Sequence, residues 1–224
     1  MPSIRIKNGH PNPKGGAAIF GLQLLLVVLV PILDDGAALA PLSYVAVLLG
    51  VLAATVSLLG YGRTAAAIGV AGVAVLGMVW VGGTTTGPIR LLLWATLIVA
   101  GVTTVALTLK SAFAAGVPPV QRIFCGAAGY VMLGFVFAAI HGLVGFLNKG
   151  GYVVQAGIEG GRPIHWSDYL WLSFATLTTA GFGDVVSVGP ASSAVSTLEA
   201  LTGILFPATL IARIASLADS RRIG

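Results

Sequence analysis

Charged residues and cysteine are both scarce in this sequence. Of its 224 residues, 8% are Asp, Glu, Lys or Arg, whereas about a quarter of the residues in a soluble domain are charged. Cys125 is the single cysteine, so an intrachain disulfide is excluded and the redox compartment stays open. Its thiol is expected to be a small buried apolar group. Hydrophobic residues make up 57% of the chain and the mean hydropathy is +0.98, which predicts an integral membrane protein.

Patterns that would indicate an enzyme or a nucleic-acid-binding protein are also missing. The sequence has no His-Glu-x-x-His motif and no pair of acidic residues inside an apolar segment, so a membrane-embedded enzyme is not expected. The net charge is +5, but the basic residues are scattered at the ends of apolar segments and form no patch. We therefore expect no nucleic-acid partner, and membrane lipids as the surroundings.

Six apolar segments lie between charged and Gly/Pro-containing stretches, each near the length of about 20 residues that a spanning helix needs. They cover residues 17–33, 42–59, 64–81, 89–109, 123–147 and 191–217. A seventh, at 167–178, is too short to cross and predicts a re-entrant half-helix, with Ser167 as its cap and Asp168 in its first turn. The predicted fold class is an all-α membrane protein with six transmembrane helices.

The first segment has a second interpretation as a signal peptide, since it follows a basic start and ends near a possible cleavage site at residues 38–40. Pro41 directly after that site would hinder cleavage. We expect a retained helix.

The basic residues also predict the orientation, because Lys and Arg accumulate on the cytoplasmic side of membrane segments. With the N-terminus inside, three basic residues fall outside: Arg90, Lys149 and Arg162. The other nine fall inside: Arg5, Lys7, Lys14, Arg63, Lys110, Arg122, Arg213, Arg221 and Arg222. We therefore expect a multi-pass protein of the cell membrane with both termini cytoplasmic and residues 148–190 external.

Residues 178–184 read Thr-Thr-Ala-Gly-Phe-Gly-Asp, between the predicted half-helix and the last apolar segment. This run resembles the signature of the potassium-channel superfamily, Thr-Val-Gly-Tyr-Gly-Asp in its commonest form. The resemblance covers about residues 120–217 and implies a prokaryotic-type six-helix subunit with one pore loop. Because the motif occurs once, it also implies a homotetramer, in which each chain supplies one strand of a selectivity filter.

A potassium site must replace the ion's water with oxygen ligands at little net cost. Backbone carbonyls can do so if successive ones point the same way, which demands alternating conformations that Gly181 and Gly183 can supply at positive φ. By resemblance, potassium ions would be bound in a filter of Thr179, Ala180, Gly181, Phe182 and Gly183, through the carbonyls of the first four and the Thr179 hydroxyl. No other cofactor is expected.

The run departs from the commonest signature at two positions. Ala180 stands where Val or Ile is usual, which is expected to loosen the packing behind the filter. Phe182 replaces Tyr and lacks the hydroxyl that often bonds a tryptophan of the half-helix, and the matching position here is Leu172. By resemblance, Trp171 would donate its indole N–H to Asp184 and brace the outer mouth; the alternative is an aromatic anchor at the membrane interface.

Further positions are candidates for filter support and gating. The half-helix would end near Thr178, with its terminal carbonyls favouring a cation. Glu199 lies about 12 Å into the last helix, and a carboxylate there is costly without a partner. We expect it to accept hydrogen bonds from Ser173 or Thr176; the alternative is a watery crevice. Gly203 and Pro207 could bend this helix, or could mark tight packing and a static kink.

The fourth apolar segment contains only one basic residue, Arg90, near its outer end. Four such charges crossing the whole field would gain roughly 9 kcal/mol per 100 mV, far below the tens supplied by an arginine ladder. We expect a potassium-selective channel with weak or no voltage sensing, or alternatively a non-selective monovalent cation channel.

His141 and His165 could sense protons, but structural roles are preferred. The gating stimulus and accessory subunits stay open. The expected divisions are a cytoplasmic N-terminus (1–16), a four-helix membrane domain (17–110), a pore domain (120–217) and a short cytoplasmic C-terminus (218–224).

Overall fold

The computed structural model describes residues 15–33, 87–114, 117–155 and 164–219. Its elements are α1 (Gly15–Leu33), α4 (Gly87–Phe113), α5 (Pro119–Leu147), β1 (Tyr152–Val154), α6 (Trp166–Leu177), β2 (Val185–Ser187) and α7 (Pro190–Asp219). Helices therefore occur at four of the six predicted apolar segments and at the predicted half-helix. The predictions for 42–59 and 64–81 lie outside the described residues.

Three of the described helices are long and apolar enough to cross a membrane: Arg90–Phe113 of α4, Pro119–Leu147 of α5 and Pro190–Ser216 of α7. The apolar part of α1, Gly15–Leu29, is shorter, about 22 Å at 1.5 Å per residue against a hydrocarbon core of about 30 Å. The helix predicted at 17–33 is confirmed, whereas its crossing of the membrane stays a prediction.

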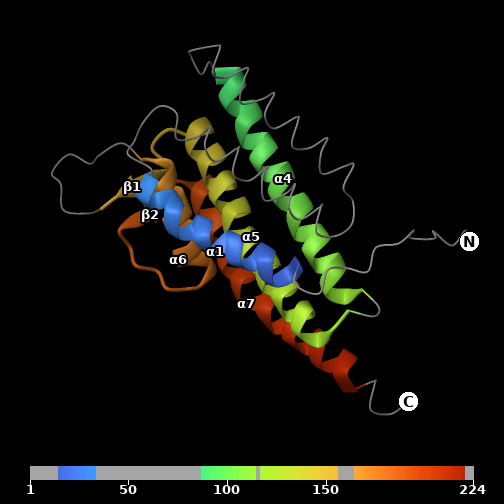
Figure 1. The fold of residues 1–224 in the computed structure, drawn as a ribbon. Coiled ribbons are helices and arrows are strands. Elements are labelled where there is room, and N and C mark those ends of the chain that lie inside the picture. The colour runs from blue at the N-terminus through green and yellow to red at the C-terminus, as the bar shows by residue number, and fades with distance from the viewer. Residues whose placement is uncertain (1–14, 34–86, 115–116, 156–163, 220–224) are drawn as a thin grey trace, which may run out of the picture.

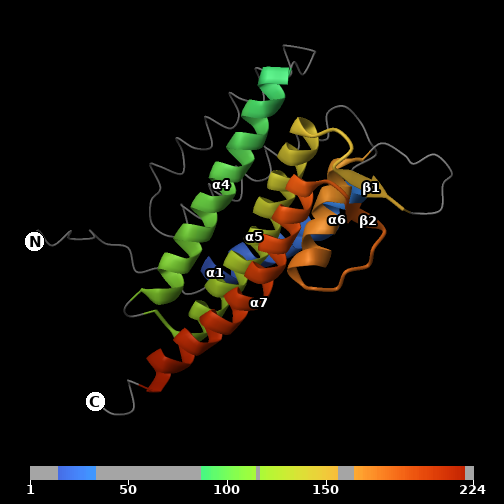
Figure 2. The same ribbon diagram turned by 180° about the vertical axis from the view of Figure 1, so that it is seen from behind.

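The helix α5 is the centre of the packing. Figures 1 and 2 show α4 and α7 lengthwise beside α5, α1 crossing it at an angle, and α6 with both strands beside its C-terminal half. The main apolar core joins residues of α1, α4, α5 and α6, among them Leu97, Met132 and Phe135. Cys125 of α5 is buried, as predicted. The core holds α6 against α5 and so fixes the position of the segment that follows α6.

A two-stranded antiparallel sheet is an addition to the predicted all-α fold. Tyr152 pairs with Ser187 and Val154 with Val185. Residues this far apart in the sequence, in strands of three, give no pattern that predicts pairing. The sheet joins the segment after α5 to the segment before α7, and it lies directly after the signature run.

The connection between α4 and α5 is held by Arg122, which the sequence indicated only as a marker of orientation. Its side chain is 7% exposed, and its guanidinium donates to the carbonyls of Ala112, Ala114 and Val117 at 3.0, 2.7 and 3.0 Å. These acceptors lie at the end of α4 and in the connection, where helix carbonyls lack intrahelical partners. Arg122 therefore ties the first turn of α5 to the end of α4.

Candidate functional site

The short helix predicted at 167–178 is present as α6, with a correction at its start. The N-cap is His165, whose backbone is extended (φ −95°, ψ 169°), so the cap predicted at Ser167 was wrong. Asp168 lies in the first turn as predicted, and its carboxylate accepts the His165 backbone N–H at 2.7 Å. The helix begins early at Trp166, which is buried and packs on Trp94 with ring centroids 5.1 Å apart.

Residues 179–183, called the signature strand below, begin as the cap of the α6 C-terminus. The Thr179 N–H donates to the Thr176 carbonyl at 3.0 Å, and the Ala180 N–H to the Ala175 carbonyl at 2.8 Å. With Thr179 in the left-handed region at φ 59°, these two bonds form a Schellman motif. The Gly181 N–H also donates to the Ala175 carbonyl, at 3.2 Å. The strand is thereby fastened to the end of α6 by its own amides.

Every second residue of the signature strand has positive φ: Thr179 at 59°, Gly181 at 57° and Gly183 at 78°. Ala180 and Phe182 are not among the positive-φ residues. The two glycines were predicted to take this conformation. Thr179 was missed because a β-branched residue rarely adopts it, although counting back in twos from Gly183 and Gly181 would have indicated it.

The first carbonyls of the signature run, those of residues 178–180, point away from the end of α6. In a trans peptide the carbonyl points opposite to the N–H of the next residue, and the described residues contain no cis peptide bond. Since the N–H groups of 179–181 are directed at the end of α6, the carbonyls of Thr178, Thr179 and Ala180 face the opposite side together. Residues 178–183 are exposed in the single chain. The arrangement presents backbone oxygens that can coordinate a cation.

The aromatic residues beside the strand contact each other differently from the prediction. Trp171 stacks on Phe182, with ring centroids 4.9 Å apart and planes inclined by 20°, and the described residues include no hydrogen bond between Trp171 and Asp184. The predicted bracing bond is therefore replaced by ring stacking. Leu172 is buried in a small cluster with Tyr152, whereas Phe182 is 64% exposed.

Glu199 is fully buried and its predicted contact with Ser173 is confirmed. Ser173 Oγ lies 2.5 Å from Glu199 Oε1, whereas no hydrogen bond to Thr176 is found among the described residues. His141 Nε2 lies 2.8 Å from Glu199 Oε2, and His141 Nδ1 lies 2.8 Å from the Tyr152 hydroxyl. The structural role preferred for His141 is thus supported, but its partners were not predicted because they lie far apart in the sequence.

Gly203 of α7 lies against the last residue of α6. A Cβ at this position would collide with the backbone of Leu177, the carbonyl oxygen above all. The same oxygen accepts a hydrogen bond from the Tyr130 hydroxyl at 3.0 Å. Tight packing is therefore the role that the structure supports for Gly203. Pro207 lies inside α7 as predicted, one turn later.

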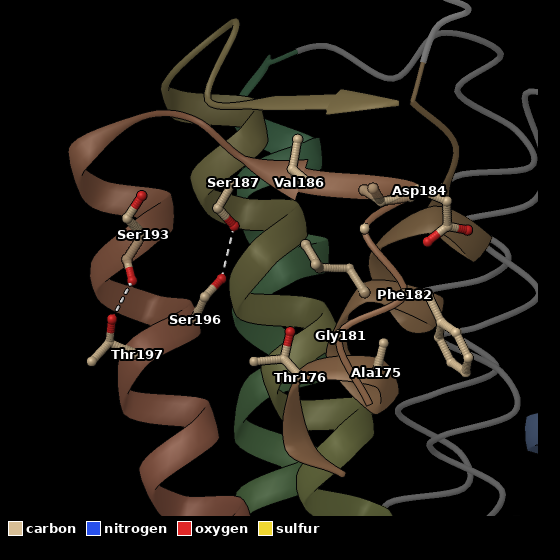
Figure 3. Close-up of a pocket in the computed structure, with 13 residues that line it drawn as sticks. Ala175, Thr176, Gly181, Phe182, Asp184, Val186, Ser187, Ser193, Ser196 and Thr197 are labelled. Atoms are coloured by element: carbon tan, nitrogen blue, oxygen red, sulfur yellow. Dashed lines mark hydrogen bonds between the residues drawn. The ribbon is translucent and has the colours of Figure 1, made fainter. Parts of the chain in front are cut away.

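A groove of about 430 Å³ opens between the signature strand and the first turns of α7. Hydroxyl side chains of α7 line one side of it, and one of them, Ser196, is hydrogen-bonded to Ser187 of β2 at 2.7 Å. Figure 3 shows the Phe182 ring and Asp184 directed away from α7, across the groove from Ser193. The strand is thus covered by α6 on one side and open on the other.

Residues 135–219 match the model of a family described as "Ion channel". The match covers more than a third of the chain and includes the C-terminal part of α5 from residue 135, all of α6, the signature strand and all of α7. No curated protein and no solved structure matched the chain in the other two comparisons. Together with the apolar helices, the match indicates a membrane protein. It supports an ion-channel family for this chain.

Proposed function

We propose that the chain is one subunit of a homotetrameric, potassium-selective channel of the cell membrane, with weak or no intrinsic voltage sensing. Ions would pass passively through a filter built from the carbonyls of Thr179, Ala180, Gly181 and Phe182. Gly183 is the last residue of this filter. Potassium is the transported substrate, and the chain needs no other cofactor for this activity.

The observation that carries the proposal is the alternation of φ along the signature strand. Positive φ at residues 179, 181 and 183 is the pattern in which successive carbonyls of an extended strand can share one direction. The amides of Thr179, Ala180 and Gly181 are occupied by α6, so the oxygens on the opposite side are free for an ion. A ring of such oxygens can replace the hydration shell of potassium.

The position of α6 adds an electrostatic argument. Its C-terminal end lies at the level of Gly203, thirteen residues into α7 and hence about 20 Å from the start of that helix. If α7 spans the membrane, α6 ends well inside a hydrocarbon core of about 30 Å. A helix C-terminus carries roughly half a negative charge, so four of them directed at one axis would stabilise a cation there.

Exposed apolar surface supports assembly. Over an apolar stretch of 18 residues in each helix, only 11% of the residues of α7 are buried, against 61% of those of α5. Leu198, Leu201 and Ile204 are each more than half exposed, on the element that borders the exposed signature strand. Lipid could cover some of this face, but oxygens of the strand could not be left in lipid without partners. Contact with three further copies around a central axis would cover the apolar face of α7 and would place the strand oxygens around a pore that holds ions and water.

The weak voltage sensing follows from α4, which contains Arg90 near its start and Lys110 in its last turn. The Arg90 guanidinium lies 5.6 Å from the centroid of the Phe146 ring. A single charge held against α5 near one end of the helix crosses little of the membrane field.

The test is reconstitution of the purified chain into liposomes and planar bilayers. We expect potassium flux that barium blocks, and a reversal potential that follows the potassium gradient in mixed potassium and sodium solutions. Gly181→Ala should abolish selective conduction, because φ is 57° there and alanine disfavours it. Gly150→Ala is the matched control: it also has positive φ, 86°, with open space for a Cβ, but lies outside the strand. Equal loss of conduction in both variants, or liposomes tight to potassium, would refute the proposal.

The alternative is a non-selective monovalent cation channel, and the exposure of Ala180 favours it. This side chain is not packed behind the strand by its own chain. A reversal potential insensitive to exchange of sodium for potassium, made selective by Ala180→Val, would support the alternative.

A further inference from the structure

A buried row of polar groups crosses the protein at the level of Ser173 in α6, and each group comes from a different element. His141 belongs to α5, Tyr152 to β1, Ser173 to α6 and Glu199 to α7. The side chains of His141, Ser173 and Glu199 have no exposed surface, and Tyr152 is 4% exposed. The row joins the three helices and the two-stranded sheet at one level of the fold.

No permanent cation neutralises Glu199 within the described part of the chain. His141 is its ion-pair partner there, and the other polar contact is Ser173. Tyrosine hydroxyls are the other titratable groups near Glu199 in the described part of the chain: Tyr130 interacts with it electrostatically, Tyr152 contacts His141, and the ring of Tyr169 packs on that of Tyr152 at 5.2 Å. A buried carboxylate without a fixed positive partner is costly.

The hydrogen bonds can be counted against the protons available. Four contacts connect the groups in sequence: Tyr152 to His141, His141 to Glu199, Glu199 to Ser173, and Ser173 to the Gly134 carbonyl at 2.7 Å. Each contact needs one proton, and a serine hydroxyl has one to give. If Glu199 is ionised and His141 neutral, Ser173 faces two acceptors with one proton, and one contact fails.

An ion pair of protonated His141 and ionised Glu199 does not place one proton in every contact either. With imidazolium and carboxylate, both ring nitrogens donate, so the Tyr152 hydroxyl proton has no acceptor in the row, and Ser173 still faces two acceptors. Only a protonated Glu199 with a neutral His141 places one proton in every contact. The donors then all point one way, from Tyr152 through His141, Glu199 and Ser173 to the Gly134 carbonyl.

We propose that Glu199 holds a proton and acts as a hydrogen-bond donor, a positioning residue that fixes α6 between α5 and α7. The proposed protonation of Glu199 is inferred from the hydrogen-bond geometry alone. The effect on conduction rests on the proposed function, because α6 carries the signature strand. Glutamine reproduces this arrangement: its amide oxygen can accept from His141 and its amide N–H can donate to Ser173. Leucine has a similar size but leaves His141 and Ser173 unpaired.

The sequence makes a direct test unusually clean, because it contains only two glutamates, Glu159 and Glu199. In a Glu159→Gln background, Glu199 is the single glutamate. The infrared C=O band of a protonated carboxyl group should be present in this protein at neutral pH and disappear on adding Glu199→Gln. If the band does not change on that substitution, Glu199 is ionised and the proposal is overturned.

Potassium flux in liposomes tests the positioning role. Glu199→Gln should conduct within about twofold of the parent with an unchanged pH profile. Glu199→Leu should lose about tenfold or more, a factor equal to 1.4 kcal/mol, because two buried polar groups lose their partner. Loss of flux in Glu199→Gln while the infrared result holds would overturn the positioning role alone. If Glu199→Leu does not fold, the glutamine variant still decides. A parent without potassium flux would refute the proposed function but leave the infrared test valid.

Discussion

Gly203→Ala tests the contact between α7 and the end of α6. An added methyl group would collide with the Leu177 carbonyl, which is backbone and cannot rotate away. The same carbonyl accepts the Tyr130 hydroxyl at 3.0 Å, so relief of the collision must lengthen that hydrogen bond or shift α7. The substitution therefore acts on the residue that directly precedes the signature run.

The magnitude has two parts. Overpacking of a well-packed site costs about 1 to 3 kcal/mol, and a lost hydrogen bond costs about 0.5 to 1.5 kcal/mol. We expect Gly203→Ala to lower the free energy of unfolding by about 2 to 4 kcal/mol per chain, measured by steric trapping or titration with SDS in bicelles. Tyr130→Phe removes the hydrogen bond without adding volume and should cost only the smaller part.

The control is Gly21→Ala, at a helical glycine with open space around the added atom. Alanine is the better helix former by about 1 kcal/mol, so this variant should be as stable as the parent or more so. If Gly203→Ala behaves like Gly21→Ala, the backbone contact does not exist. A hinge at Gly203 would then be the better explanation of this glycine.

Three further predictions concern other contacts. Arg122→Lys should lower the free energy of unfolding by about 3 kcal/mol, because an ammonium group cannot reproduce three fixed hydrogen bonds to backbone carbonyls; the measurement is the same, and an unchanged value would contradict the role of the guanidinium. Trp171→Ala should lose a stack worth about 0.5 to 1.5 kcal/mol and shorten channel openings in bilayer recordings, whereas Trp171→Phe keeps a ring on Phe182 and should resemble the parent; the reverse order would restore the indole N–H as the important group. Burial raises the pKa of the Tyr152 hydroxyl, so stability is complete below the usual tyrosine pKa of about 10 and falls as the pH rises above it, because only the unfolded chain ionises. Tyr152→Phe should flatten that alkaline fall in melting temperature; an equally steep fall would show that Tyr152 does not cause it.

The described helices could be predicted from the sequence because each is a long apolar run bounded by charges, glycine or proline. The ends were less certain: α5 begins at Pro119, four residues before the predicted start, since proline suits the first helical position. The start of α6 was misplaced because Ser167 is a good cap by type. The Trp166 ring packs on Trp94 instead and places Trp166 in the first turn of the helix. That contact joins residues far apart in the sequence.

The signature strand could be located from the sequence, but its surroundings could not. Thr179, Gly181 and Gly183 are alternate residues of one short run, so their conformation follows from local rules and from the family resemblance. The partners of Glu199 are 26 and 58 residues away, and nothing local marks them. Ser173 was predicted because it is a hydroxyl of the half-helix expected behind the filter, whereas His141 was missed because the facing side of α5 has no distinguishing pattern.

Two contacts between α6 and α7 show that these helices run in the same direction. Ser173 contacts Glu199, and four residues later Leu177 contacts Gly203. The partner also advances by four, so the two helices run the same way, with about 6 Å between the contacts. A shift of one helix along the other would break a hydrogen bond at the first level and create a collision at the second.

The helix α5 repeats these two levels in the opposite direction. The Gly134 carbonyl contacts Ser173, and Tyr130, one turn earlier in the chain, contacts Leu177. The helix α6 is therefore held at two levels by helices on two sides, whereas residues 178–183 are exposed in the single chain. It follows that the position of the strand is determined mainly through α6. Any movement of α7 that opens a pore must either leave both levels intact or displace the strand itself.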